Sequence, residues 1–255
     1  MRIIIYCLLI GNFIWAQNIN EAEKLMDRVS DRLINTDLGS TIEFEYLFEN
    51  ESYKMNQPIN GALSLFSENR FYLEFNNGDN QMIQLYNGIN LFTILLEEKE
   101  IQIDEMNTDK GLFIQNIFNN YKNEFTSYIK EKNNKLTLIE LIPKKKYNQS
   151  IFNTCIDTLS LPSCLKLPNQ CKIGITSKMQ ESLNECLENN QGYIEHEILK
   201  VEIIINPNTL DMESIKQTNR YNGQTNIEIK KIKSASIDML NIDGLYTDFE
   251  IIDLR

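Results

Sequence analysis

Histidine is almost absent from this chain, since His196 is the only one among 255 residues. Catalytic triads and most acid–base sites depend on histidine, so its scarcity narrows the mechanisms open to an enzyme. The sequence also lacks the Gly-x-Ser-x-Gly, His-Glu-x-x-His, P-loop and dinucleotide-binding motifs. Acidic residues are plentiful, but no pair of them is marked out for glycoside chemistry. We therefore expect a protein that is not an enzyme and that uses no cofactor.

Positive charge is also scarce, because the chain has 25 lysines and arginines but 36 aspartates and glutamates, which gives a net charge of −11. Nucleic acids bind to basic patches, so we expect no nucleic-acid partner. One basic cluster stands out, at Lys144-Lys145-Lys146. It is interpreted as a solvated turn, with a docking patch as the alternative.

Long apolar runs are missing except at the N-terminus. There Arg2 precedes an apolar stretch from Ile3 to Ala16 that is broken by Asn12. A membrane-spanning helix needs ~20 such residues, so this stretch is too short to span a bilayer. The pattern is typical of a signal peptide cleaved after Ala16, and a buried first strand is the alternative. We expect residues 1–16 to be removed and residues 17–255 to form one soluble domain in the periplasm.

Cysteine is scarce as well, with five in the chain, of which Cys7 lies in the predicted signal peptide. The other four are Cys155, Cys164, Cys171 and Cys186. An even number in an oxidising compartment predicts two disulfides, with three possible connectivities. A metal site is the alternative, but the intervals of 8, 6 and 14 residues are wider than structural zinc sites use. We expect no metal, and a disulfide-linked insertion at residues 147–194.

Most of the remaining chain shows strand patterns. A helix is predicted from Asn20, with Glu23 completing a capping box and apolar residues at helical spacing as far as Leu33. Residues 42–48 alternate as a strand, and residues 61–96 form a meander with a hairpin at Asn87-Gly88. Further strands follow, with a second hairpin at Asn222-Gly223. About ten strands must manage their edges by closing or nearly closing, which predicts an α+β fold with an incomplete antiparallel β-barrel.

Several segments together resemble the family of LolA-type periplasmic outer-membrane lipoprotein carriers. They are Gly61-Ala62-Leu63, Arg70-Phe71, the Asn87-Gly88 hairpin, Ile117 to Phe125, Leu141-Ile142-Pro143 and Glu250 to Arg255. The resemblance covers nearly all of residues 17–146 and 197–255. Two positions differ, since Ser67 stands near where the family has a lid-locking arginine and Asn87 replaces the usual hairpin aspartate.

The resemblance implies a helical lid over a half-open barrel that holds acyl chains. It implies a periplasmic chaperone that shields lipoprotein acyl chains during transfer from the inner to the outer membrane. Cargo would come from an inner-membrane lipoprotein-releasing ABC transporter and pass to an outer-membrane acceptor, with the protein expected to be a monomer. The alternative is a periplasmic sensor or interaction module of the same fold that detects lipoproteins or lipids.

Aromatic residues are the candidates for a binding site. Those proposed to line an acyl-chain cavity are Phe44, Tyr46, Phe48, Phe71, Phe75 and Phe92. Those proposed to form the lid are Phe113, Ile117, Phe118 and Tyr121. An ordinary hydrophobic core is the alternative explanation for both sets. A large apolar cavity would bind acyl chains because each buried methylene contributes about 0.8 kcal/mol.

Overall fold

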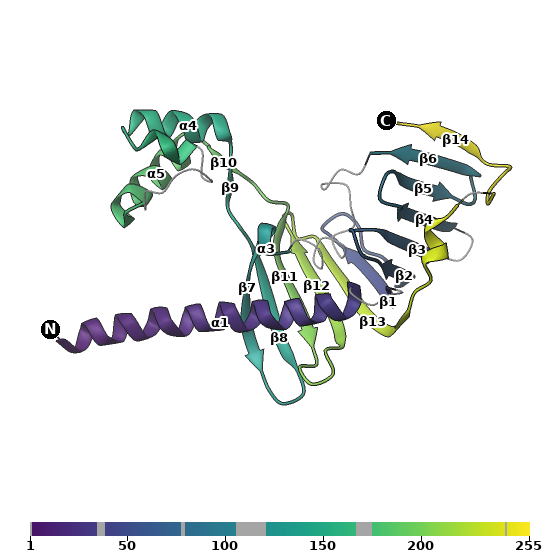
Figure 1. Cartoon of the computed structure of the whole chain (residues 1–255), viewed down its shortest axis with the longest axis horizontal. Coiled ribbons are helices and arrows are strands. Elements are labelled where there is room, and N and C mark those ends of the chain that lie inside the picture. The colour runs from purple at the N-terminus through teal and green to yellow at the C-terminus, as the bar shows by residue number, and fades with distance from the viewer. Residues whose placement is uncertain (1, 35–38, 78–79, 106–120, 167–174, 243) are drawn as a thin grey trace. The chain divides into compact units, whose positions relative to one another are not determined.

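The computed structural model describes residues 2–34, 39–77, 80–105, 121–166, 175–242 and 244–255. The chain divides into two compact units (Figure 1). The first, here called the sheet unit, comprises Met1–Ile142 and Ile198–Arg255. The second, the insertion unit, comprises Pro143–Glu197 and includes the predicted insertion at residues 147–194.

The sheet unit is built on one open sheet of twelve strands. In sequence order they are β1 (Ser40–Glu49), β2 (Ile59–Leu65), β3 (Phe71–Asn77), β4 (Asn80–Tyr86), β5 (Leu91–Leu95), β6 (Glu100–Asp104), β7 (Phe125–Lys132), β8 (Thr137–Pro143), β11 (Ile198–Ile205), β12 (Met212–Asn219), β13 (Gln224–Ser234) and β14 (Glu250–Asp253). Their spatial order is β14-β6-β5-β4-β3-β2-β1-β13-β12-β11-β8-β7. The sheet has two edges, β14 and β7, so it does not close. The predicted α+β fold with an incomplete antiparallel barrel is therefore confirmed, with twelve strands rather than about ten and with β14 running parallel to β6.

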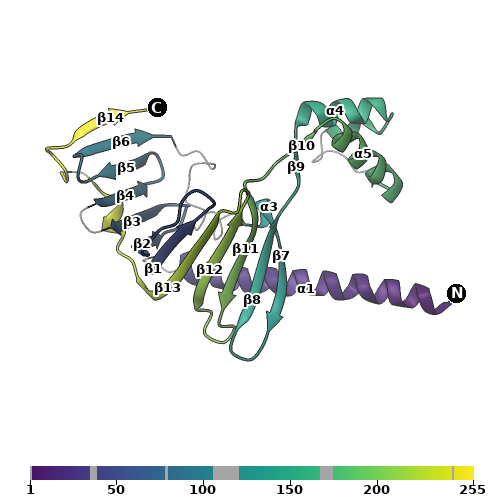
Figure 2. The ribbon, with the colours of Figure 1, turned by 180° about the vertical axis from the view of Figure 1, so that it is seen from behind.

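Helix α1 (Arg2–Ile34) lies across strands β7, β8, β11 and β12 (Figures 1 and 2). Its buried residues Ala22, Leu25, Met26, Val29 and Leu33 recur at the predicted helical spacing. The predicted start at Asn20 is wrong, because the helix already runs through this position. No proline interrupts the stretch before it, so no residue forces a boundary there. Among the described residues, no helix is both long and apolar enough to cross a membrane.

The main core lies between α1 and the sheet face beneath it, which we call the α1 face. It is formed by the buried α1 residues together with alternate strand residues such as Ile42, Leu63, Leu73, Val201 and Ile203. Short helix α3 (Tyr121–Glu124) joins this core through Tyr121. The alternation of side chains along each strand thus places the apolar set against the helix, as the sequence pattern predicts.

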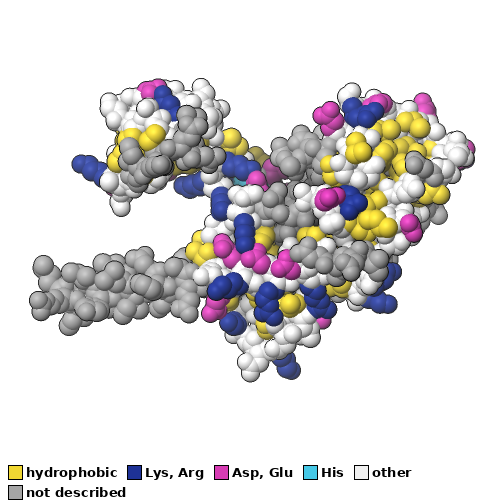
Figure 3. Space-filling view, viewed as in Figure 1, with side chains coloured by type: hydrophobic (Ala, Val, Ile, Leu, Met, Phe, Trp, Pro, Cys, Tyr) yellow, Lys and Arg dark blue, Asp and Glu magenta, His cyan; other side chains and the backbone are white. Residues whose placement is uncertain are grey.

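The core changes faces at the β4–β6 end of the sheet. Ile83, Leu85, Phe92, Ile94 and Ile101 form a second buried cluster on the opposite, outer face. The C-terminal segment covers this cluster with Ile242, Tyr246 and Phe249, after 3₁₀-helix η2 (Ile237–Leu240). This end of the sheet unit also shows hydrophobic side chains at its surface (Figure 3), including Leu245, Ile251 and Leu254.

Both predicted hairpins are present. Between β4 and β5, Gly88 has a φ of 100°, and the Asn87 side chain accepts hydrogen bonds from the backbone N–H groups of Ile89 and Asn90. Between β12 and β13, the residues with positive φ are Tyr221 and Asn222, one position earlier than the Asn-Gly pair suggests. The second turn is therefore shifted by one residue.

The insertion unit is a helical hairpin held by a disulfide. It contains α4 (Gln149–Thr158), η1 (Ser163–Lys166), α5 (Ser177–Asn189) and the two-stranded pair β9 (Lys146–Tyr147) and β10 (Tyr193–Ile194). The side chain of Asn148 caps α4, and that of Thr176 caps α5. Cys155 of α4 is bonded to Cys186 of α5, and Cys164 is also disulfide-bonded, whereas Cys171 lies outside the described residues. The prediction of disulfides in this region is thus confirmed for these three cysteines.

Candidate binding surface on the α1 face

Three aromatic rings meet on the α1 face above strand β2. The Phe44 and Phe75 ring centroids are 5.8 Å apart, and those of Tyr46 and Phe75 are 5.6 Å apart, both in edge-to-face contact. Phe44 and Tyr46 come from β1, whereas Phe75 comes from β3, so the contact reaches across the strand between them. Edge-to-face pairs at this separation add stability beyond the area that they bury.

Gly61 of β2 makes this contact possible. It is paired with Phe44 on one side and with Phe75 on the other. A Cβ atom at Gly61 would come within 2.4 Å of Phe44 Cζ, so the Phe44 ring occupies the space that a side chain would need. This gives a physical reason for the glycine in the Gly61-Ala62-Leu63 motif: the aromatic residues of two strands share the space above it.

Burial along this face decreases away from α1. Phe44 and Phe71 are 2% and 0% exposed and belong to the main core. Tyr46, Phe75 and Tyr86 pack against that core but remain partly exposed. Phe48 is also partly exposed and stacks at 6.4 Å on Tyr53, which is 56% exposed. We call Tyr46, Phe48, Tyr53 and Phe75 the aromatic stripe.

The residues of the aromatic stripe carry no charge. Burial raises the pKa of Tyr46 above its usual value, more than a hydrogen bond with Thr225 lowers it. Tyr46 is therefore neutral at physiological pH. Further along the same face, β4 to β6 present Gln84, Thr93 and Gln102, which are register partners, and Gln102 Nε2 donates to the Glu100 carboxylate at 2.6 Å. The aromatic stripe itself can bind apolar groups, but it supplies no nucleophile or general base.

Phe92 is not brought together with the other predicted cavity residues. It pairs with Leu85, which pairs with Tyr72, so these side chains share the outer face of the sheet. Phe92 is 8% exposed and belongs to the second cluster, beneath the C-terminal segment. Phe44, Tyr46, Phe48, Phe71 and Phe75 all alternate onto the α1 face. The structure thus assembles five of the six candidates on one surface.

Of the four residues predicted for the lid, Phe113, Ile117 and Phe118 lie outside the described residues. Tyr121 is described and is 4% exposed in the main core. Its hydroxyl donates to the Glu23 carbonyl oxygen at 3.0 Å and to Asp27 Oδ1 at 3.1 Å, both on α1. Burial, with the nearby Asp27 carboxylate, raises the pKa of Tyr121. Tyr121 therefore anchors the end of this segment to α1, and the lid itself stays a prediction.

The sequence did not predict a cavity that lies within the insertion unit. Its volume is about 610 Å³. It is lined by Lys145, Tyr147, Phe152, Leu165, Ile175, Gln180, Leu183, Asn184, Leu187 and Tyr193. These residues come from α4, α5, η1, the two short strands and the loops that hold Lys145 and Ile175. The pairing of the short strands could not be recognised in so short a pattern. Searching the described residues for clusters of metal-ligating side chains finds none.

No family model matches the chain, and no curated protein matches it. Similar solved structures include an uncharacterised conserved protein from Thermus thermophilus, with 6% identity, a TM-score of 0.49 and coverage of 91% of this chain and 99% of that chain. A LolA superfamily protein from Nitrosomonas europaea has 7% identity, a TM-score of 0.39 and coverage of 89% and 97%. A putative outer membrane lipoprotein-sorting protein domain from Vibrio parahaemolyticus has 8% identity, a TM-score of 0.42 and coverage of 90% and 100%. With identities and scores this low, function must be argued from the chain's own residues.

Proposed function

We propose that this protein is a periplasmic carrier that binds the acyl chains of lipoproteins on the α1 face of its open sheet. The observation that supports the proposal is the aromatic stripe, which continues the buried core outward into partly exposed positions. Such a surface gains free energy by covering hydrocarbon, at roughly 25 cal/mol for each Å² of apolar area removed from water. An open sheet also lets a ligand enter and leave without unfolding the core.

The specific role that we propose is the transfer of lipoproteins from the inner to the outer membrane. In this role the protein accepts cargo from a lipoprotein-releasing ABC transporter, shields the acyl chains and delivers them to an outer-membrane acceptor. Residues 1–16 serve as the signal peptide for export, and Phe113, Ile117 and Phe118 belong to a helical lid over the bound chains. The Cys155–Cys186 disulfide is consistent with an oxidising compartment.

The direct test is binding of a triacylated lipoprotein. The protein should hold it in a one-to-one complex on gel filtration, and should not hold the same lipoprotein after deacylation. Phe48→Asp should weaken binding about 10- to 100-fold, because a Phe contact with hydrocarbon contributes ~1.5–3 kcal/mol. Ile89→Asp is the matched control, since Ile89 is 79% exposed in the β4–β5 turn. Comigration with the deacylated form alone would contradict the proposal.

A transfer experiment distinguishes a carrier from the alternative, a sensor. A carrier loaded with labelled lipoprotein should pass it to outer-membrane vesicles that contain the acceptor, and should reload from inner-membrane vesicles. A sensor should retain the lipoprotein and instead bind a membrane regulator when loaded. Acyl binding without transfer would therefore favour the sensor.

A further inference from the structure

The cavity of the insertion unit has an apolar wall. Phe152, Leu165, Leu183 and Leu187 are between 2% and 7% exposed and form the core of this unit around the cavity. The Phe152 ring stacks on the Tyr147 ring with centroids 4.4 Å apart, which extends the apolar surface to the exposed strand β9. A volume of about 610 Å³ lies within the ~300–1,000 Å³ typical of small-molecule sites. One part of this cavity can therefore take a hydrocarbon group.

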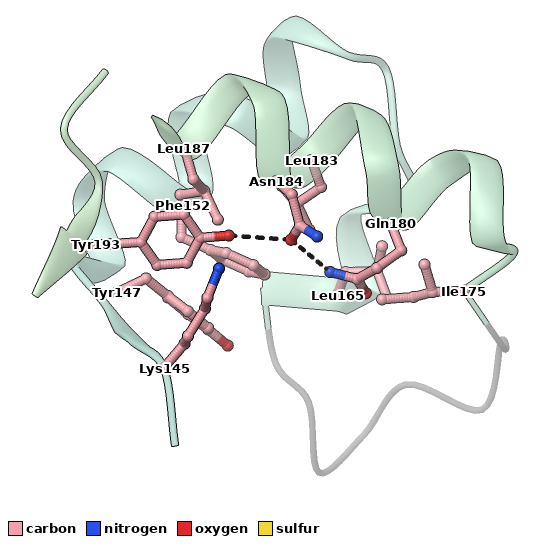
Figure 4. A pocket seen from close by; sticks show the side chains of 10 residues that line it. All are labelled: Lys145, Tyr147, Phe152, Leu165, Ile175, Gln180, Leu183, Asn184, Leu187 and Tyr193. Atoms are coloured by element: carbon pink, nitrogen blue, oxygen red, sulfur yellow. Dashed lines mark hydrogen bonds between the residues drawn. The ribbon is translucent and has the colours of Figure 1, made fainter. Parts of the chain in front are cut away.

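A cation lies at the same cavity. The Lys145 ammonium is 4.8 Å from the centroid of the Tyr193 ring, so its position is held by a cation–π contact. Lys145 forms no ion pair with any residue that the structure describes. In Figure 4 its nitrogen points toward the middle of the lining residues. Its charge is thus available to a ligand.

Three polar side chains of the lining are joined by hydrogen bonds. Asn184 Oδ1 accepts hydrogen bonds from the Tyr193 hydroxyl at 3.0 Å and from Gln180 Nε2 at 2.9 Å (Figure 4). These three side chains are paired with one another, whereas the Lys145 ammonium is suited to an anionic oxygen.

We propose that this cavity binds a single-chain carboxylate, that is, one hydrocarbon chain that ends in a carboxylate group. The carboxylate accepts from Lys145 Nζ, and the chain lies along the wall formed by Phe152, Leu183 and Leu187. Charge-assisted hydrogen bonds at one end and apolar burial at the other together select an amphiphilic anion. The site lies wholly in the insertion unit, so it does not depend on the proposed carrier function.

Isothermal titration calorimetry of the full chain with dodecanoate, below its micelle concentration, tests the proposal. Decanoate should bind more weakly, by up to about fourfold for each missing methylene. Acetate, which lacks the chain, and dodecyltrimethylammonium, which has the opposite charge, should not bind at this site. Equal binding of dodecanoate and dodecyltrimethylammonium would overturn the proposal, because the cation would then have no role.

Matched variants locate the site. Lys145→Gln should weaken dodecanoate binding about three- to tenfold, with the effect shrinking at high salt. Lys144→Gln removes the same charge one residue earlier, outside the cavity lining, and should leave the affinity unchanged. Phe48→Asp, in the aromatic stripe of the sheet unit, should also leave it unchanged. Equal weakening by both lysine variants, or loss of binding in Phe48→Asp, would show that the carboxylate binds elsewhere.

Discussion

At the scale of single residues, Gly61 decides whether the aromatic rings of β1 and β3 can meet. We predict that Gly61→Val destabilises the fold by about 1–3 kcal/mol, because the added side chain must displace the Phe44 ring. It should also weaken acyl binding, since Phe75 packs against the Phe44 ring and Tyr46 packs against Phe75. Urea denaturation followed by circular dichroism measures the first effect and gel filtration with lipoprotein the second. Ala62→Val is the control, because the next residue of β2 faces the other side of the sheet; equal losses in both variants would contradict this role of Gly61.

Other single residues show what a strand pattern can and cannot predict. Alternation in β1 and β3 correctly groups Phe44, Tyr46, Phe71 and Phe75, because a period of two fixes which residues share a face. It does not reveal which face is covered at each end of a twelve-stranded sheet. Phe92 was therefore grouped with the others, although the C-terminal segment buries it on the outer face. That covering segment is distant in sequence and has no regular pattern of its own.

At the scale of secondary-structure elements, α1 protects an edge of the sheet through Asn18. Its side-chain Oδ1 accepts from the Ile129 backbone N–H at 2.6 Å, and its Nδ2 donates to the Ile129 carbonyl oxygen at 3.0 Å. Ile129 lies in edge strand β7, so one amide side chain satisfies backbone groups that would otherwise have no strand to pair with. The sequence predicted the buried α1 residues correctly. It missed Asn18 because this contact spans 111 residues.

We predict that Asn18→Ala loosens β7 and lowers the free energy of unfolding by about 1–2 kcal/mol, since two partly buried hydrogen bonds are lost. Hydrogen exchange at the Ile129 amide measures the local effect directly, and it should become faster. Asn20→Ala is the control, because Asn20 is on the same helix but exposed. An unchanged Ile129 exchange rate in Asn18→Ala would show that α1 does not protect this edge.

At the scale of the whole molecule, the chain combines two units with separate cores. The sheet unit has its clusters around α1 and beneath the C-terminal segment, whereas the insertion unit has its own cluster around Phe152 and Leu183. Cysteine spacing and a change in pattern indicated the insertion, because those signals are local. The cavity within it could not be predicted, since it depends on how Lys145, Tyr193 and Asn184 come together.

Separate cores imply separate unfolding. The Cys155–Cys186 disulfide joins positions 31 residues apart, and removing it with Cys155→Ala and Cys186→Ala together should destabilise the insertion unit by about 2–4 kcal/mol. Hydrogen exchange read by mass spectrometry should then show faster exchange in α4 and α5 and unchanged protection in β1 and β11. Dodecanoate binding should weaken in the same variant, whereas lipoprotein binding on the α1 face should persist.

Chemical reduction of the unmodified protein is the control, and it should raise the exchange rate of the same amides in α4 and α5. Loss of protection in β1 and β11 would instead show that the two cores unfold as one cooperative structure, and the aromatic stripe would then depend on the insertion for its stability.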